Sequence, residues 1–318
     1  MKIEKLSPAF KDYLWGGTKL KTEFGKQSDL NIVAESWELS THPAGESRIC
    51  GGEFDGMTLN EYLQQAGPAA LGKNAAAFAQ FPVLIKFIDA ASPLSIQVHP
   101  SDEYALEVEH EYGKTEMWYV LDCEEGASLY FGVEKELAPE EFAARIENNT
   151  LTDVLRKVPV HPGDVFFIEA GTIHAIGAGI LICEIQQNSN TTYRVYDYGR
   201  VGADGKPREL HVEKAKAVSR LTPNEPGAGA GKITAVPGGT VQPLAACKYF
   251  TTRRLEVTGE MTLDVDNSSF VSLVATEGTG EVRGENTVPF VRGDSLFVPA
   301  GSGSVTVTGP CTLVETRI

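Results

Sequence analysis

The segment HPGDVFFIEAGTIHAI, residues 161–176, occurs twice in the chain in similar form, because VRGDSLFVPAGSGSVTV, residues 291–307, aligns with it without a gap. Identical positions recur at a constant offset: Gly163, Asp164, Phe167 and Gly171 match Gly293, Asp294, Phe297 and Gly301. In each copy a Gly-Asp turn leads into an apolar strand, and a second glycine turn leads out of it. The repeat predicts two β-barrels of one design in tandem.

The sequence around this repeat is also mainly β in character. Short runs rich in Val, Ile, Phe, Tyr and Thr are separated by scattered glycine and proline, and about seven such runs follow the Gly- and Pro-rich segment that begins at residue 221. Three stretches have helical spacing instead and are expected to be insertions: residues 57–80, 101–112 and 135–157. We therefore predict one domain at 1–220 that carries the helical insertions and a smaller β domain at 221–318.

The charge balance excludes several classes of partner. Lys and Arg number 28 against 43 Asp and Glu, which gives a formal net charge of −15. A nucleic-acid-binding or polybasic membrane-surface protein needs cationic surface, so neither is expected. No run approaches the ~20 apolar residues of a membrane span, and the first residues lack the apolar block of a signal peptide. Five dispersed cysteines without a CxxC pair indicate a reducing compartment, so we predict a cytoplasmic protein.

Two predicted strands place polar side chains together on one face. In SPLSIQVHP, alternation puts Ser95, Gln97 and His99 on the same side, and in GKTEMWYVL it does so for Lys114 and Glu116. Such a face is expected to line solvent or a wet cavity. A single strand histidine is more often an ordinary surface or core residue, so the prediction of a site depends on several polar residues considered together.

Taken together, four side chains form a plausible ligand set for a divalent metal. They are Gln97, His99, Glu116 and His174. Two imidazoles, a carboxylate and an amide oxygen suit Zn²⁺ or a related metal and leave one position open for substrate, which is typical of a catalytic site. In the second copy of the repeat Ser304 aligns with His174, so the domain at 221–318 is expected to lack a metal site.

Further polar residues extend this predicted site. Glu184 in ILICEIQQ and Arg194 in TTYRVYDYGR follow His174 in the chain. Arg194, Lys114 and the metal would concentrate positive charge for an anionic substrate. As an alternative, either residue could form a surface ion pair of little consequence. Lys86 in VLIKFIDA could pack by its stem or face the cavity and bind substrate. Of the other histidines, His110 and His211 are expected to be solvated or packing residues, and His161, which precedes a glycine turn, is expected to be structural.

Several of these segments carry a family resemblance. The spacing Gly163-x5-Glu169-x-Gly171-x2-His174 resembles the second cupin motif, with Glu in place of the usual Pro. In order along residues 9–216, the chain resembles type I phosphomannose isomerases of the short bacterial branch in the segments FKDYLWGG, ESWELSTHPAGES, PLSIQVHPSDEYA, GKTEMWYVL, GTIHAI, EIQQNSNTTYRVYDYGR and RELHVEKA. The resemblance implies two tandem double-stranded β-helix (cupin, or jelly-roll) barrels, the second degenerate.

The resemblance also implies an activity and roles for residues. It implies one zinc ion per chain and the interconversion of mannose 6-phosphate and fructose 6-phosphate through a cis-enediol. The family's metal ligands fall on Gln97, His99, Glu116 and His174; its catalytic arginine on Arg194; and its active-site lysine, serine and acid on Lys114, Ser95 and Glu184. Asn190 stands where longer members carry an aspartate, so no proton transfer is assigned there.

We therefore predict a zinc-dependent aldose–ketose isomerase that takes a sugar phosphate and acts as a monomer or weak homo-oligomer. Glu184 is preferred to His99 as the proton carrier, because a metal-bound histidine transfers protons poorly. The main alternative is a non-catalytic cupin that senses sugar phosphates. A cupin oxygenase is disfavoured by the amide ligand and the lack of a third histidine, and a storage protein by the polar strand faces.

Overall fold

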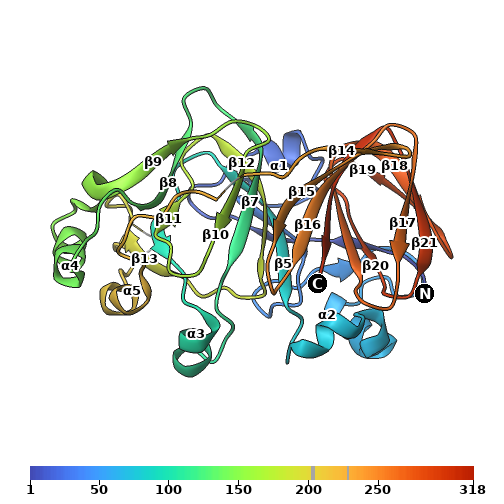
Figure 1. Cartoon of the computed structure of the whole chain (residues 1–318), viewed down its shortest axis with the longest axis horizontal. Coiled ribbons are helices and arrows are strands. Elements are labelled where there is room, and N and C mark those ends of the chain that lie inside the picture. Colours follow the sequence, from blue (N-terminus) through green and yellow to red (C-terminus); the bar gives the residue numbers. More distant parts are fainter. Residues whose placement is uncertain (202–204, 228) are drawn as a thin grey trace. The chain divides into compact units, whose positions relative to one another are not determined.

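The computed structural model describes residues 1–201, 205–227 and 229–318 (Figure 1). Its contacts divide the chain into two compact units. The terminal unit comprises Met1–Tyr13, Thr18–Phe87 and Ala230–Ile318, and the central unit comprises Leu14–Gly17 and Ile88–Gly229. Both units are mainly β, as predicted. The predicted domain boundary between residues 220 and 221 stays a prediction.

The central unit holds two sets of antiparallel strands. In one, β7 (Glu116–Cys123) lies between β10 (Val165–Ile168) and β12 (Ile180–Gln187). The other has five strands in the order β13-β6-β11-β8-β9: β13 (Tyr193–Tyr196), β6 (Ile96–Val98), β11 (His174–Ala175), β8 (Ser128–Val133) and β9 (Leu155–Pro159). These short strands are the expected double-stranded β-helix.

Helices cover the outer face of the five-stranded sheet (Figure 1). The helical elements of this unit are α3 (Asp102–Val108), α4 (Pro139–Glu147), η3 (Leu151–Val154) and α5 (Val212–Val218). Phe142 and Ile146 of α4 and Ala215 of α5 join Ile96 and Val98 of β6 in one buried apolar cluster. Because side chains alternate along a strand, Gln97 is left on the opposite, inner face. The packing of the helices thus fixes which residues point into the barrel.

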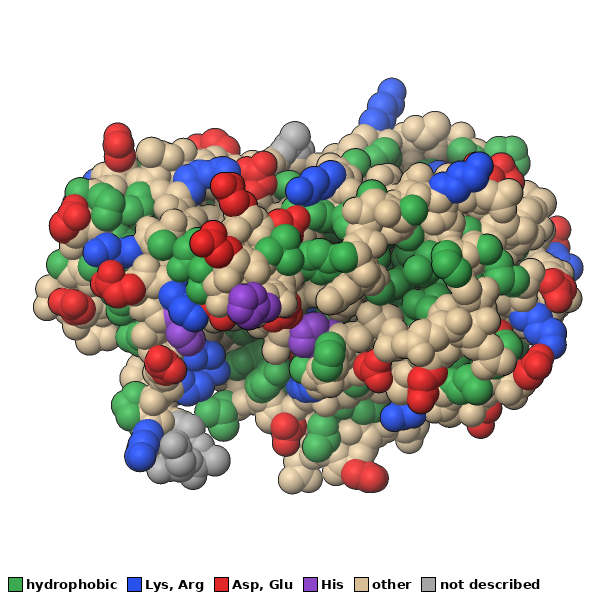
Figure 2. All heavy atoms as spheres, turned by 90° about the horizontal axis from the view of Figure 1, so that it is seen from below, with side chains coloured by type: hydrophobic (Ala, Val, Ile, Leu, Met, Phe, Trp, Pro, Cys, Tyr) green, Lys and Arg blue, Asp and Glu red, His purple; other side chains and the backbone are tan. Residues whose placement is uncertain are grey.

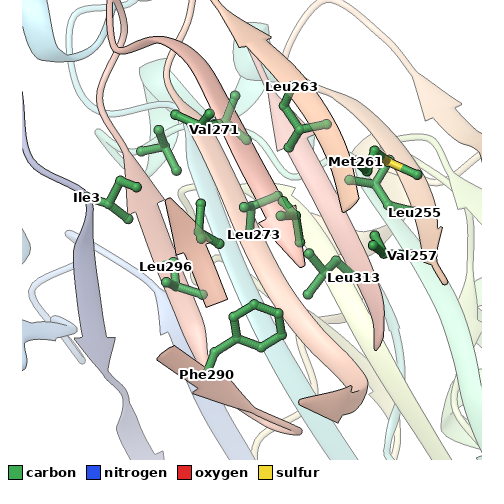
Figure 3. Close-up of a cluster of buried hydrophobic side chains, with 14 of the residues drawn as sticks. Ile3, Leu255, Val257, Met261, Leu263, Val271, Leu273, Phe290, Leu296 and Leu313 are labelled. Carbon is green, nitrogen blue, oxygen red and sulfur yellow. The ribbon is translucent and has the colours of Figure 1, made fainter. Parts of the chain in front are cut away.

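The terminal unit contains a larger barrel built mostly from the C-terminal residues. Its eleven strands are β1 (Glu4–Ser7), β4 (Arg48–Ile49), β14 (Thr234–Val236), β15 (Gly239–Ala246), β16 (Thr251–Val257), β17 (Glu260–Val265), β18 (Val271–Arg283), β19 (Thr287–Val291), β20 (Ser295–Val298), β21 (Gly303–Thr308) and β22 (Cys311–Arg317). Its interior is a cluster of hydrophobic side chains that includes Leu255, Leu273 and Leu313 (Figure 3). This barrel has a dry core.

The remaining elements of the terminal unit precede residue 88. They are β2 (Ala9–Lys11), α1 (Lys19–Thr22), β3 (Glu35–Leu39), α2 (Leu59–Ala66), η1 (Pro68–Ala70) and η2 (Lys73–Ala77). Strand β5 (Val83–Ala90) crosses from one unit to the other. Helix α2 begins at a capping box, since Thr58 accepts from the backbone of Glu61 and the Glu61 carboxylate accepts from that of Thr58.

Two details differ from the sequence prediction. The stretch 135–157 was expected to be helical throughout, but residues from Leu155 onward form β9, whose backbone pairs with β8. The N-terminal strand β1 pairs with β20 of the C-terminal barrel and places Ile3 in its core. Pairing with β1 covers backbone groups of β20, and no local pattern in the first residues indicates so distant a partner.

The internal repeat is reproduced at the level of single hydrogen bonds. Strands β10 and β20 keep the offset of the sequence alignment, and Gly163 and Gly293 have the same φ of 93°. In both turns the aspartate Oδ2 accepts a backbone N–H from three residues earlier, at 2.8 Å for Asp164 and 2.7 Å for Asp294. The predicted duplication is therefore also a structural one.

The duplication extends to an irregularity in the neighbouring strands. Gly163 donates to the carbonyl of Val120 on β7, and Gly293 donates to that of Ala275 on β18. The next residue of each strand is skipped in the pairing with β12 or β22, so both copies contain a β-bulge at the same point. These shared landmarks allow residues of the two barrels to be matched one by one.

Candidate active site

The centre of the site is a buried group of two imidazoles and a carboxylate. His99 follows β6, Glu116 begins β7 and His174 begins β11, and all three are at most 1% exposed. Nε2 of His174 lies 3.3 Å from Oε1 of Glu116, and Nε2 of His99 lies 3.7 Å from Oε2. The three candidate ligand atoms are all within 4.8 Å of one another.

Both histidines are oriented by backbone carbonyls. Nδ1 of His99 lies 2.9 Å from the carbonyl oxygen of Thr191, and Nδ1 of His174 lies 2.8 Å from that of Thr172. An Nδ1–H that donates to a carbonyl leaves the lone pair on Nε2, the atom that faces Glu116. Burial lowers the pKa of His174 to about 4, so its ring is neutral at pH 7.

These residues fit a metal ion. The Nε2 atoms of two neutral imidazoles and the oxygens of Glu116 are all hydrogen-bond acceptors, and acceptors that converge at 3.3–3.7 Å are brought together favourably by a cation between them. Borderline nitrogen and oxygen donors in this number suit zinc and related divalent metals. The structure thus brings together three of the four predicted ligands, His99, Glu116 and His174.

Gln97 lies beside the cluster. It is the residue of β6 that pairs with His174 of β11, and its Nε2 is 3.5 Å from Nε2 of His174. A half-turn about the last side-chain bond replaces this nitrogen with Oε1, the amide atom that coordinates metals. The geometry is therefore compatible with the predicted fourth ligand.

Lys114 connects the cluster to a second buried carboxylate. Its Nζ lies 2.8 Å from Oε2 of Glu116 and 3.5 Å from Oε1 of Glu184. Glu184 is in the middle of β12, 2% exposed, and its Oε2 accepts a hydrogen bond of 2.9 Å from Nε1 of Trp118. One ammonium thus lies between two carboxylates in a buried site, which is an arrangement suited to proton transfer.

Trp118 has a role that its sequence context did not indicate. Trp118 is a buried residue of β7, and its indole N–H donates to the Glu184 carboxylate. The same ring meets His174 edge to face, with centroids 5.3 Å apart. The only sequence signal was that Trp118 shares a strand face with Glu116.

Arg194 lies on β13 directly opposite Gln97 of β6. Its Nη1 donates to the carbonyl of Glu209 at 3.1 Å, and burial lowers the pKa of its guanidinium, with Arg208 adding to the shift. Its backbone N–H donates to Nδ1 of His211 at 3.1 Å. His211 was expected to be a surface or packing residue; it is half-buried at the start of α5 and fixes the backbone of Arg194.

Two further arginines near Arg194 were missed by the sequence reading. Arg200 and Arg208 both donate to the carboxylate of Asp197, which is 6% exposed. Their guanidiniums hold the pKa of Asp197 below its usual value although burial opposes this. Arg200 and Arg208 are 3 and 11 residues from Asp197, and all three lie outside the helices and strands, where no periodic spacing applies, so the sequence gives no signal that they gather here.

The other predicted residues are placed as follows. Ser95 is buried just before β6. Lys86 of β5 belongs to the terminal unit, where its Nζ lies 3.5 Å from Glu35 and over the ring of Trp37. Asn190 is exposed, and its backbone N–H donates to Glu111. Roles for Ser95 and Lys86 in binding substrate stay predictions.

Comparison with known proteins agrees with the geometry. Residues 3–127 match the family model described as phosphomannose isomerase type I, catalytic domain, and residues 240–318 match that of the mannose-6-phosphate isomerase cupin domain. Mannose-6-phosphate isomerase ManA of Bacillus subtilis is 38% identical, with 95% of this chain and 94% of the relative covered. The chain belongs to the type I phosphomannose isomerases. It is therefore an isomerase with the cupin fold.

Other members of the phosphomannose isomerase family extend the agreement. Mannose-6-phosphate isomerase of Streptococcus mutans is 35% identical, with 90% of this chain and 89% of the relative covered. The crystal structure of mannose 6-phosphate isomerase from Bacillus subtilis superimposes with a TM-score of 0.92 at 34% identity, and both chains are covered completely. The family prediction from sequence is thus confirmed over both units.

The described part of the surface shows no feature typical of nucleic-acid or membrane binding on the face drawn in Figure 2. On the face seen in Figure 2, acidic and basic side chains are interspersed without a continuous basic patch. Among the described residues, no helix is long and apolar enough to cross a membrane. Location in the cell and oligomeric state stay predictions.

Proposed function

We propose that this isomerase interconverts mannose 6-phosphate and fructose 6-phosphate with one zinc ion held by His99, Glu116, His174 and Gln97. The observation that carries the proposal is the convergence of Nε2 of both histidines on the Glu116 carboxylate. When bound there, zinc supplies Lewis acidity towards the oxygens of the sugar. The relatives' names support the choice of substrate.

Glu184 is proposed as the base that carries the proton between C1 and C2 of the sugar. Aldose–ketose isomerisation moves a proton between C1 and C2 through a cis-enediol, and the base must keep the proton while the carbon changes. Glu184 is buried, is oriented by Trp118 and lies outside the proposed ligand set. His99 and His174 direct Nε2 into the cluster, so neither has a free nitrogen for this task.

Lys114 and Arg194 are proposed to stabilise the negative charge that develops on the sugar oxygens. Lys114 lies between Glu116 and Glu184, so its ammonium can donate to a sugar oxygen next to the reacting carbons. Arg194, on the same strand pair as Gln97, would stabilise enediolate or phosphate charge. Removing water from such a site strengthens both interactions.

The role of Arg194 can be tested by substitution. R194A is expected to lower kcat/KM at least about 10²-fold, because a donor to developing charge is lost. Metal content should remain near one per chain. R145A, which removes an arginine from α4 in the same unit, is the matched control and should leave kinetics unchanged. Loss of metal in R194A would instead assign the arginine a structural role.

The reaction itself is tested in D₂O. Protein with quantified metal is incubated with mannose 6-phosphate, and the sugars are followed by NMR. We expect fructose 6-phosphate to form, to stop forming on chelation and to form again with added zinc, with deuterium at C1 or C2. No turnover with a full metal site would contradict the proposal and support the alternative of a sugar-phosphate sensor.

A further inference from the structure

The barrel of the terminal unit has a polar end above its dry core. Strands β16 and β22 are neighbours, and the core residue Leu255 lies directly opposite Leu313. Two residues further along the inward face, Arg253 lies directly opposite Glu315. A pocket of about 370 Å³ opens at this end. Its polar lining comprises Arg253, Arg317, Glu315, Asp264, Thr251 and Thr262.

The pocket is organised by a buried carboxylate. Glu315 is 1% exposed and accepts from Nε and Nη2 of Arg253 at 2.6 and 3.1 Å and from Nε of Arg317 at 2.5 Å. A guanidinium has five N–H groups. Within the described residues these three bonds leave most of the N–H groups of both arginines available, and their side chains are 37% and 22% exposed.

Stability alone does not account for this group. A buried ion pair is often no more stabilising than apolar side chains of the same volume. A second buried carboxylate of the central barrel is replaced by an apolar side chain. When the two barrels are matched by their shared glycine turn and bulge, Val271 occupies the position of Glu116. By the same matching Glu315 stands where the central barrel has Glu184. At these two matched positions the terminal barrel thus has one buried carboxylate, that of Glu315, and Arg253 and Arg317 both donate to it.

The lining defines the chemistry of a ligand. Guanidinium N–H groups in a fixed orientation bind oxyanions such as phosphate or carboxylate. Asp264 also lines the pocket and is exposed. A carboxylate accepts hydrogen bonds from hydroxyl groups, and the hydroxyls of Thr251 and Thr262 can donate or accept. The volume is in the lower part of the range for small-molecule sites.

We propose that this pocket is a second binding site for a small hydroxylated oxyanion, such as a monosaccharide phosphate or a sugar acid. The oxyanion lies against Arg253 and Arg317, and the hydroxyl groups face Asp264. The site does not depend on the metal cluster, because every residue that lines it belongs to the terminal unit.

The test observes the arginines directly in the full-length protein. Uniformly ¹⁵N-labelled, chelator-treated protein is titrated with mannose 6-phosphate, inorganic phosphate and 6-phosphogluconate, and the Nε–Hε resonances of Arg253 and Arg317 are followed by NMR. We expect both resonances to shift and saturate. Mannose 6-phosphate and 6-phosphogluconate should bind at least about fivefold more tightly than phosphate, and D264N should remove that difference.

Substitutions separate this site from the proposed active site. R317Q should weaken binding at the Arg253 resonance at least about tenfold and leave kcat unchanged; Arg253 still holds Glu315, so the barrel is expected to fold. R283Q, outside the pocket but in the same unit, should change neither. Isomerase activity is measured on the metal-loaded form of the same preparation. Unshifted arginine resonances together with normal activity of the metal-loaded form would overturn the second site, whereas shifted resonances without turnover by the metal-loaded form would overturn only the proposed function. Equal affinity for phosphate and the sugar derivatives would overturn the hydroxylated class of ligand.

Discussion

The two copies of the repeat share one backbone and differ in what their strands present to the barrel interior. In both, a glycine turn, an aspartate that closes it and a bulge in the adjacent strand pair coincide. The strand after each glycine turn, β10 or β20, pairs with β7 or β18. At the residue where β7 begins, the central barrel has Glu116, and at the matching residue of β18 the terminal barrel has Val271. The turns thus specify the scaffold, while a few inward side chains decide between a polar site and a dry core.

The copies also differ in phase after the second glycine turn. His174 follows Gly171 by three residues and is fully buried in the polar cluster. Ser304 follows Gly301 by the same number but is exposed, and Val305 faces the core instead. A shift of one residue exchanges the two faces of a strand. Ser304 is therefore the partner of His174 in the alignment but not in the barrel interior.

The largest effect is expected from making the central barrel resemble the terminal one. H174V should abolish tight metal binding and lower kcat/KM at least about 10³-fold, because an imidazole ligand is replaced by the side chain found at Val305. Metal analysis and steady-state kinetics measure both. V305A is the converse control. It should cost about 2–3 kcal/mol of stability and leave kcat unchanged. Normal metal content in H174V would contradict the ligand assignment.

A smaller effect is expected from the residue that orients Glu184. W118F keeps the ring but removes the indole N–H, so kcat should fall about tenfold while KM and metal content stay constant. The terminal barrel has Leu273 at this position, which has no N–H to offer. W15F, a buried tryptophan elsewhere in the central unit, is the control. Equal kcat in W118F and wild type would show that the hydrogen bond only contributes to packing.

How much of this could be predicted from sequence depends on the kind of signal. Strand alternation placed Gln97 and His99 on one shared face and Glu116 on another polar face, and the repeat indicated the two barrels, because both depend on local sequence patterns. The contact of Trp118 with Glu184 and of His211 with Arg194 depends on pairing between strands or with a helix that are distant in the chain. Arg253 and Glu315 are likewise 62 residues apart in the chain. Arg200 and Arg208 are only 3 and 11 residues from Asp197, but all three lie outside the helices and strands, where no periodic spacing applies.

The smallest effect concerns stability and a carboxylate at the margin of the terminal barrel. Burial raises the pKa of Glu4, on β1 beside β20, to about 7. Because the folded-state pKa exceeds the unfolded value, the folded state is favoured when Glu4 is protonated. That stabilisation is complete below about pH 4.5 and is lost as the pH rises through 7.

The variant E4Q should remove this pH dependence. At pH 8 it should unfold with a free energy higher than wild type by about 1–3 kcal/mol, and at pH 4 the two should be equal. Denaturant unfolding at both pH values measures the difference. The same offset at both pH values would show that the effect does not arise from titration. Isomerase activity should be unaffected, since Glu4 lies in the terminal unit.

The most direct test compares the two carboxylates that occupy matching positions, Glu184 of the central barrel and Glu315 of the terminal barrel. Steady-state kinetics and metal content of E184Q and E315Q should be measured side by side. The account predicts a fall in kcat of about 10²–10⁴-fold in E184Q with metal retained, and a kcat within about twofold of wild type in E315Q. Activity within about threefold of wild type in E184Q, or its loss in a folded E315Q, would contradict the assignment of the chemistry to the central barrel.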